Sequence, residues 1–202
     1  MSQRLPPFTA DILREVMNIG GAHATTALAK LSHQRIDIGV PSVELLKIEE
    51  VPDYVGGTGD LRSMILHEVS GDVLGVILLS FSEEDAHLFT ENIRMEHHLA
   101  QDGVLPMLQE LGNIVSGSCF GAIAKFLDLH FNHSLPSAAT DISGAILGSL
   151  LAEIGQRADD ALITELSFRA DTLKIDGRMF LLFDPDSTQS ILSAAQKKIH
   201  TS

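Results

Sequence analysis

The chain of 202 residues has a single cysteine, Cys119, and no long hydrophobic run. One cysteine excludes a disulfide framework and fits a reducing compartment. The longest apolar stretch is VLGVILLSF at 73–81, far short of the roughly 20 residues that a membrane span needs. The N-terminal MSQRLPPFTA lacks the apolar segment of a secretory signal. We therefore expect a cytoplasmic protein that does not insert into a membrane.

Basic residues are also scarce, with 14 Lys and Arg against 27 Asp and Glu and a net charge of −13. Nucleic acids and anionic membranes repel such a chain, so we expect neither as a partner. The same charge disfavours a free phosphorylated small molecule as ligand, unless a cation accompanies it. The composition is otherwise that of a globular protein, with 45% hydrophobic residues available for a core.

A short pattern occurs twice, as EVMNI at 15–19 and as ELGNI at 110–114. Aligning 11–45 with 106–140, an offset of 95 residues, gives nine identical pairs, where about two are expected by chance. The pairs are Leu13/Leu108, Glu15/Glu110, Asn18/Asn113, Ile19/Ile114, Ala27/Ala122, Ala29/Ala124, Lys30/Lys125, Pro41/Pro136 and Ser42/Ser137. We predict one domain over 1–202, built from two repeats at about 9–96 and 104–199.

Each half predicts a long helix, a strand that runs into a proline, a β-hairpin and a second helix. The predicted helices lie near 9–31, 83–96, 104–127, 141–156 and 185–199. The predicted strands lie near 35–48, 61–70, 73–81, 129–137, 162–170 and 173–183. Ser82 with Asp85, and Asp184 with Ser187, are typical of helix N-terminal caps. The predicted fold is α+β, with two copies of one unit related by a pseudo-twofold axis and helices covering an antiparallel sheet.

The repeated pattern places a carboxylate and an amide one turn apart on each long helix. At 100° per residue, an apolar stripe of Ile12, Val16 and Ile19 should face the sheet, and a separate ridge runs beside it. The first ridge consists of Asp11, Glu15, Asn18 and Ala22, and the second of Pro106, Glu110, Asn113 and Gly117. Asparagine is unfavourable inside a helix, so its occurrence at the same place in both copies favours a function.

The residues that follow each ridge are small: Gly20 and Gly21 in the first copy, and 116–118 in the second. They predict a slim helical turn that another macromolecule could approach closely. A structural interpretation stays open, in which the glutamate is a solvated surface charge. In that interpretation the asparagine braces the loop that carries Pro41 or Pro136.

The strings DILREVMNIGGAHATTALAKL and VPSVELL, with their partners ELGNIVSGSCFGAIAKFL and LPS, resemble the CheC/CheX/FliY family of chemotaxis phosphatases, and CheC in particular. The resemblance extends from about 8 to 198. The signature of the family is an acidic or serine residue, a glutamate, an asparagine three residues later, and a proline a little over twenty residues further on. Asp11, Glu15, Asn18 and Pro41 match it in full. The second copy matches with Glu110, Asn113 and Pro136, but Pro106 replaces the acidic or serine residue.

The resemblance implies hydrolysis of the aspartyl phosphate on a CheY-type response regulator. Asn18 and Asn113 would orient the attacking water, and Glu15 and Glu110 would pair with a lysine of the regulator. Mg²⁺ would be held by the regulator, so the resemblance implies no metal or other cofactor on this chain. Asp11, Pro41 and Pro136 would support the two sites, and the site with Asn18 should be the stronger because its pattern is complete.

Two rival motifs predict other chemistry. The segment Gly117–Gly121, GSCFG, fits the elbow that presents a nucleophile in some hydrolases, but that elbow must follow a strand and 104–116 has a helical pattern. We therefore expect Cys119 to be a packed small residue. The pairs His97-His98 and His130 with His133 could suggest a metal site, but neither is completed by a cysteine or a spaced carboxylate, and we expect no metal ligands.

The alternative function is a non-catalytic adaptor that binds the receptor deamidase CheD or the flagellar switch. Asp141, in ATDISGAILGSL, lies in a region that resembles the one that CheC proteins offer to CheD. A helix N-cap explains an aspartate there equally well. The recurrence of Glu and Asn in register favours the enzyme, because a pure adaptor does not need it.

Overall fold

The structure is a computed structural model that describes residues 5–57, 59–98, 103–156, 159–170 and 174–201. The helices are α1 (Pro7–Ser32), α2 (Val51–Gly56), α3 (Glu83–Glu96), α4 (Val104–Leu127), α5 (Ser143–Ile154) and α6 (Pro185–Thr201), with a 3-10 turn η1 (Ile48–Glu50) before α2. The strands are β1 (Ile36–Ile38), β2 (Ser42–Lys47), β3 (Leu61–Gly71), β4 (Gly75–Ser82), β5 (Phe131–His133), β6 (Ser137–Ile142), β7 (Asp160–Ala170) and β8 (Ile175–Phe183). The fold is therefore α+β, as predicted.

All eight strands form one antiparallel sheet in the order β1-β7-β8-β4-β3-β5, in which β2 also pairs with β7 and β6 also pairs with β3. The hairpins β3–β4 and β7–β8 meet at the centre, where β4 pairs with β8. The short strands β1 and β2 of the first half thus pair with β7 of the second half. The short strands β5 and β6 of the second half pair with β3 of the first half. Each half completes its sheet with strands of the other half.

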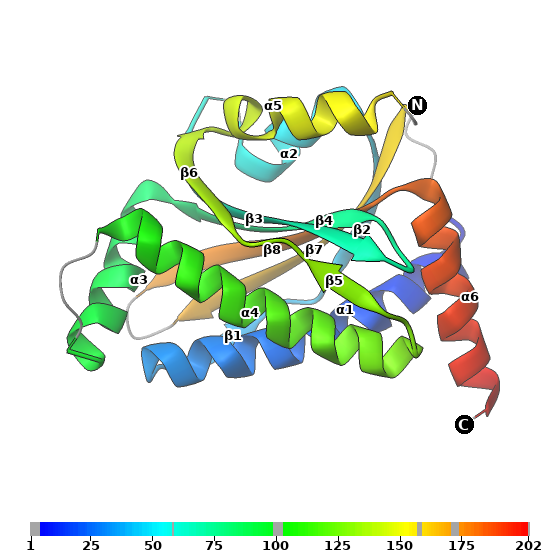
Figure 1. Cartoon of the computed structure of the whole chain (residues 1–202), viewed down its shortest axis with the longest axis horizontal. Coiled ribbons are helices and arrows are strands. Elements are labelled where there is room, and N and C mark those ends of the chain that lie inside the picture. The colour runs from blue at the N-terminus through cyan, green and yellow to red at the C-terminus, as the bar shows by residue number, and fades with distance from the viewer. Residues whose placement is uncertain (1–4, 58, 99–102, 157–158, 171–173, 202) are drawn as a thin grey trace.

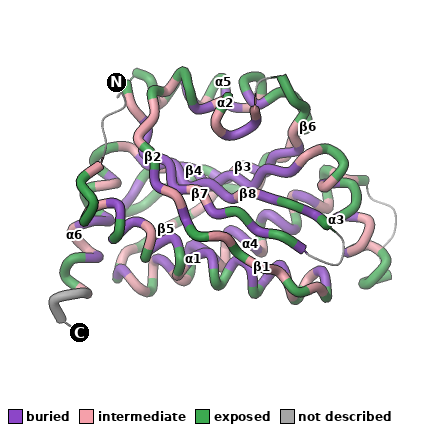
Figure 2. Tube along the Cα trace, turned by 180° about the vertical axis from the view of Figure 1, so that it is seen from behind, coloured by how far each residue is buried: buried purple, intermediate pink, exposed green. Residues whose placement is uncertain are grey.

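Helices cover both faces of the sheet, so the molecule has three layers (Figure 1). On one face, α1, α3, α4 and α6 enclose a core that includes Leu13, Leu111 and Leu79. On the other face, α2 and α5 enclose a second core that includes Val55, Leu147 and Leu78. Neighbours on β4 point to opposite faces, and each finds an apolar layer. The strands β4, β7 and β8 are buried over most of their length for this reason (Figure 2).

The elements recur in the same order in the two halves, and the offset of 95 found in the sequence applies to several of their ends. The helices α1 and α4 end at Ser32 and Leu127, and β2 and β6 begin at Ser42 and Ser137. Both long helices end on a left-handed residue, His33 with φ 51° and Asp128 with φ 56°. A duplication would produce this arrangement, and its origin by duplication stays a prediction.

The strand boundaries differ from the prediction at both prolines. The predicted strands at 35–48 and 129–137 are each interrupted, at 39–41 and at 134–136, and the second continues to Ile142. Proline has no N–H to donate to a sheet ladder, and Pro41 and Pro136 therefore lie in the breaks. The sequence analysis also assigned no element to 49–55, where η1 and α2 form.

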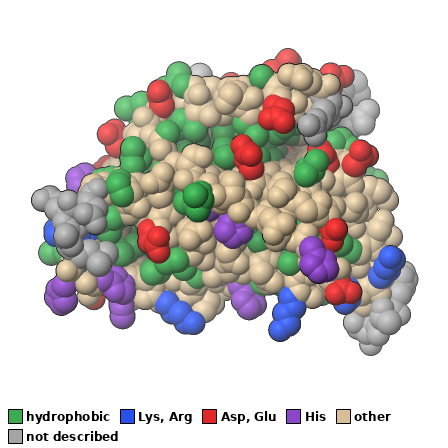
Figure 3. Space-filling view, in the orientation of Figure 1, with side chains coloured by type: hydrophobic (Ala, Val, Ile, Leu, Met, Phe, Trp, Pro, Cys, Tyr) green, Lys and Arg blue, Asp and Glu red, His purple; other side chains and the backbone are tan. Residues whose placement is uncertain are grey.

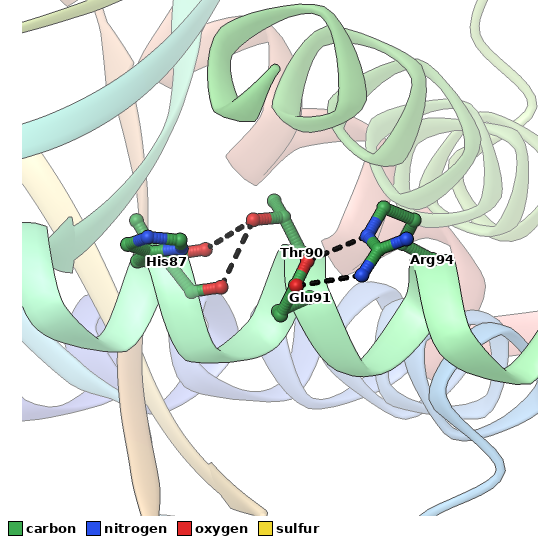
Figure 4. Close-up of polar contacts among 5 residues, drawn as sticks. His87, Thr90, Glu91 and Arg94 are labelled. Atoms are coloured by element: carbon green, nitrogen blue, oxygen red, sulfur yellow. Dashed lines mark hydrogen bonds and ion pairs between the residues drawn. The ribbon is translucent and has the colours of Figure 1, made fainter. Parts of the chain in front are cut away.

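The predicted N-terminal caps of α3 and α6 are confirmed. The N–H of Asp85 donates to Ser82 Oγ at 2.9 Å, and the N–H of Ser187 donates to Asp184 Oδ1 at 2.7 Å. Further along α3, both nitrogens of the Arg94 fork donate to Glu91 at 2.7 Å, and Thr90 donates to the carbonyls of Ala86 and His87 (Figure 4). The arginine lowers the pKa of Glu91 through this hydrogen bond. These contacts all lie within α3.

The small residues of α1 serve the interior, which corrects the expectation of a slim turn open to another macromolecule. Gly20 and Gly21 are buried. A Cβ on Gly20 would lie 2.7 Å from Cys119 Sγ and from Ile123 Cδ1 of α4, and one on Gly21 would meet Leu166 of β7. The two long helices cross closely because Gly20 has no side chain. The predicted stripe is also broader than expected, since Leu13 and Met17 are buried with Ile12 and Val16, whereas Ile19 is only half-buried.

Candidate functional site

The first ridge lies on the outer side of α1, and its Asp11, Glu15 and Asn18 belong to the N-terminal half of the helix. Asp11, Glu15 and Asn18 are all exposed. Asp11 Oδ1 accepts a hydrogen bond from Arg14 at 2.9 Å. Within the described residues, the side chains of Glu15 and Asn18 make no hydrogen bond or ion pair with the protein. The carboxylate and the amide are therefore both available to another molecule.

The second ridge occupies the equivalent place on α4, which runs antiparallel to α1 across the same face of the sheet (Figure 1). Glu110 and Asn113 are exposed, and neither has a polar partner in the part of the chain that the structure describes. Pro106 lies in the first turn of α4, which begins at Val104. The structure thus places the Glu and Asn of each copy together, on two different helices.

The prolines of the pattern lie in the loops between the paired short strands. Pro41 is buried and Pro136 is half-buried. Gly39 N–H donates to Ser167 O at 2.9 Å, and Ser134 N–H donates to Glu68 O at 2.9 Å. Gly39 and Ser134 are themselves 95 residues apart. Each proline loop is therefore attached to a long strand by the same backbone hydrogen bond.

Two side chains that the sequence analysis missed link the second proline loop to the rest of its site. Gln109 Nε2 donates to Pro136 O at 3.3 Å. His67 of β3 is fully buried, and its Nδ1 donates to Ser134 O at 2.9 Å. A Cβ on Gly112 of α4 would lie 3.4 Å from His67 Nε2, so the ring also touches the helix between Glu110 and Asn113. No local pattern marks either residue, because the contacts join segments that are far apart in the sequence.

Burial lowers the pKa of His67, and the nearby His133 lowers it further, while the hydrogen bond to Ser134 O opposes this. The rings of His67 and His133 meet edge to face with centroids 5.2 Å apart. His67 is consequently a neutral packing residue beneath α4 at neutral pH. The first site differs here, since Leu166 faces Gly21 of α1 from β7.

The bracing role proposed for the asparagines is wrong for the described residues. Gln109, one turn before Asn113, holds the loop of Pro136, and the side chain of Asn18 makes no hydrogen bond to the loop of Pro41. Both asparagines are exposed instead. The interpretation of Glu15 and Glu110 as solvated surface charges agrees with their exposure. It does not explain why an unpartnered asparagine lies beside each of them.

The alternative interpretation of Asp141 as a helix cap is also wrong. Asp141 belongs to β6, opposite Arg62 of β3, and α5 begins at Ser143 with Ile142 in the cap position. The exposed Asp141 carboxylate accepts a hydrogen bond only from the adjacent N–H of Ile142, at 2.7 Å, among the described contacts. The helix begins two residues later than expected because β6 continues to Ile142 along β3.

The rival motifs give no site. The segment Gly117–Gly121 lies inside α4, so it cannot form a strand-to-helix elbow, and burial raises the pKa of the Cys119 thiol to about 12. Cys119 is a packed residue, as predicted. His97 Nε2 lies 2.8 Å from Leu31 O, and His130 Nδ1 lies 3.5 Å from Asp72 Oδ2. Over the described residues, no group of three or more His, Cys, Asp or Glu could hold a metal ion.

Two cavities in the described part of the molecule lie elsewhere. One of about 400 Å³ lies beside α5, lined by residues such as Leu74, Leu150 and Leu182, and a second of about 460 Å³ lies between α5 and β6. Neither is lined by Glu15, Asn18, Glu110 or Asn113. Small-molecule sites are concave, whereas the two ridges are convex helix surfaces. Their shape suits a reactive group that is carried on the surface of another macromolecule.

Acidic side chains outnumber basic ones on the surface shown in Figure 3. On the face shown in Figure 3, Lys and Arg side chains are few and lie in the lower half of the view, while acidic side chains are spread more widely. Among the described residues, no helix combines the length and the apolar character needed to cross a membrane.

Comparisons with known proteins find relatives in sequence and in fold. Residues 8–45, which contain Asp11, Glu15, Asn18 and Pro41, match the CheC-like family. The CheY-P phosphatase CheC of Bacillus subtilis is 30% identical over 196 residues, which cover 91% of this chain and 92% of that protein.

Two solved structures share the fold at lower identity. Thermotoga maritima FliY superposes with a TM-score of 0.74 and 17% identity, over 97% of this chain and 100% of that one. The middle domain of FliM from H. pylori superposes with a TM-score of 0.67 and 12% identity, over 94% and 99% of the two chains. These likenesses concern the fold alone, and the near full-length sequence match to the Bacillus protein carries the assignment: the chain belongs to the CheC-like family.

Proposed function

We propose that the protein hydrolyses the aspartyl phosphate of a CheY-type receiver domain at two centres, Glu15 with Asn18 and Glu110 with Asn113. The observation that carries the proposal is the pair of exposed helical asparagines without a partner among the described residues, each one turn after an equally free glutamate. The related Bacillus protein is named a CheY-P phosphatase. A convex ridge fits a substrate of this kind, because the phosphoryl group is attached to a protein surface.

The reaction transfers a phosphoryl group to water. Water attacks phosphorus in line, the bond to the aspartyl oxygen breaks, and the products are inorganic phosphate and the free carboxylate. Such reactions depend mainly on positioning and on neutralising charge. The amide oxygen of Asn18 or Asn113 would accept a hydrogen bond from the water and orient it. A carboxylate in that place would bring a further negative charge toward the phosphoryl oxygens, and the neutral amide does not.

The glutamates would dock and aim the receiver. Glu15 and Glu110 are exposed at the same helical spacing from their asparagines and would each pair with a lysine beside the phosphorylated aspartate. Mg²⁺ would be bound by the receiver and would neutralise the phosphoryl oxygens there. Activity should then depend on Mg²⁺ only through the receiver domain, and chelator dialysis of this protein alone should not change its activity. Tight zinc retained by the purified chain after that dialysis would contradict this part of the proposal.

The test is the decay of a phosphorylated receiver domain in the presence of this protein. Changing both Asn18→Ala and Asn113→Ala should remove the accelerated decay, since the loss of a water-orienting group costs on the order of 10²-fold or more. Folding should be retained, because alanine is the better helix former. Asn132→Ala on β5 is a matched control, since Asn132 is exposed but belongs to neither ridge. A folded double variant that still dephosphorylates the receiver at the parental rate would leave the adaptor function in its place.

One observation favours an adaptor role beside the enzymatic one. Asp141 is exposed and does not cap α5, and among the described contacts its carboxylate accepts only the hydrogen bond from the adjacent Ile142 N–H. We infer that Asp141 is part of a surface for a protein partner, for which CheD is the candidate. Asp141→Ala should weaken binding to CheD in calorimetry and leave the melting temperature unchanged. If CheD does not bind the parental chain, the assignment of this partner fails.

A further inference from the structure

Two aliphatic side chains stand almost fully in solvent beside the proposed centres. Val40 is 88% exposed and Leu135 is 86% exposed, and the next most exposed large hydrophobic residue is Met95 at 65%. Both precede a proline of the repeated pattern, and they are 95 residues apart. A single exposed leucine or valine is ordinary on a protein surface. The same exposure at equivalent positions of both halves calls for a common cause.

The backbone holds both side chains outward. The residue before each of them, Gly39 or Ser134, donates its N–H to a long strand at 2.9 Å. The residue after each of them is a proline with restricted backbone angles, buried at Pro41 and half-buried at Pro136. Each aliphatic residue is thus the middle of a tripeptide that is fixed at both ends. A residue fixed in this way loses little freedom when a partner covers it.

The loop of Leu135 contacts α4 beside the second ridge. Gln109 Nε2 donates to Pro136 O at 3.3 Å, and Gln109 lies one turn before Asn113 on α4. Leu135 consequently stands on the loop that adjoins Glu110 and Asn113. In the first half, β1 and β2 flank the loop of Val40 and pack against α1, which carries the first ridge. Any protein surface that reaches one of the asparagines would therefore lie near one of these aliphatic residues.

We propose that Val40 and Leu135 are docking residues, each of which enters an apolar recess on the receiver domain next to its phosphorylated aspartate. This inference rests on the proposed function. The chain carries a net charge of −13, and its proposed substrate is a phosphorylated protein, so charge alone attracts the receiver only through its lysine and its cation. An apolar contact adds affinity that does not depend on salt, and it places the receiver at the correct distance from the amide.

The two residues should affect binding rather than the chemical step. In a chain with Asn18→Ala, which leaves the second centre alone, Leu135→Ser should raise the half-saturating concentration of phosphorylated receiver about 10-fold, because burial of such a side chain is lost. The maximal rate should change by less than about two-fold, since uniform binding is removed. Leu135→Met, which keeps an aliphatic chain, should restore most of the affinity. Val40→Ser should have the corresponding effect at the first centre in a chain with Asn113→Ala.

Met95→Ser is the matched control, because Met95 is exposed on α3 and belongs to neither ridge. All variants should keep the parental melting temperature, since the changed side chains are in solvent. If Asn113→Ala abolishes activity at the second centre while Leu135→Ser leaves the half-saturating concentration unchanged, the inference is wrong and the proposed function stands. If Leu135→Ser instead converts a self-associating chain into a monomer in sedimentation without changing that concentration, the loops join copies of this chain, and the inference is equally wrong. Activity that survives both asparagine changes would overturn the proposed function itself.

Discussion

The ridges on α1 and α4 carry the same glutamate and asparagine, but the fold supports them differently. On α4, Gln109 and His67 tie the adjoining loop by hydrogen bonds to Pro136 O and Ser134 O. On α1 the residue equivalent to Gln109 is Arg14, which pairs with Asp11 of its own ridge. The exposed carboxylate and amide are therefore alike in the two halves, while the residues that support them differ. Support can differ as long as the spacing of the two polar groups is kept by the helix.

The largest expected effect concerns the contact between the two helices. Gly20→Val should destabilise the protein by about 1–3 kcal/mol, because the new side chain would collide with Cys119 and Ile123. On α4, Gly121 has open space around its Cβ position, and Gly121→Ala should stabilise the helix by up to about 1 kcal/mol. Urea unfolding of both variants measures the difference. Equal effects of the two changes would mean that α1 and α4 do not pack as the structure has them.

A smaller effect is expected when the two centres are compared one at a time. Asn18→Ala should lower the dephosphorylation rate a few-fold more than Asn113→Ala does. Asp11 adds a second carboxylate one turn before Glu15, whereas Pro106 adds none, and exposed charges of this kind contribute modestly. Initial rates below saturation with receiver provide the measurement. The opposite order would show that the polar ties of the α4 site matter more than the additional charge on α1.

The smallest effect is expected from pH, through His67. Because burial lowers its pKa below the ordinary value of 6.5, the unfolded chain binds the proton first as pH falls. The stability associated with neutral His67 is complete above pH 6.5 and decreases as pH falls below it toward the folded pKa. His67→Leu, which introduces the residue found at Leu166 in the other half, should reduce the loss of stability between pH 7.5 and 5.5. Thermal melts at both pH values test this, with the exposed His23→Asn as the control that should leave the loss unchanged.

Much of the fold followed from local patterns. The 3.6-residue periodicity predicted α3 and α4 with the observed ends. Ser82 and Asp184 predicted the N-terminal caps of α3 and α6, because a side-chain oxygen can satisfy a free N–H there. The breaks at Pro41 and Pro136, the helix α2 and the late start of α5 were missed. Each depends on which strand pairs with which, and short-range patterns do not contain that information.

For the candidate sites, the sequence by itself determined which residues recur in register: Glu15 with Asn18, Glu110 with Asn113, and the two prolines. Helical geometry then fixed the carboxylate and the amide one turn apart, since 3.6 residues make a turn whatever the surroundings. Only the tertiary structure decided that Gly20 serves the crossing of α1 and α4, that His67 and Gln109 hold the second loop, and that Val40 and Leu135 stand in solvent. These contacts join residues that are distant in the chain, and their distances are set by the packing of whole elements rather than by any local preference.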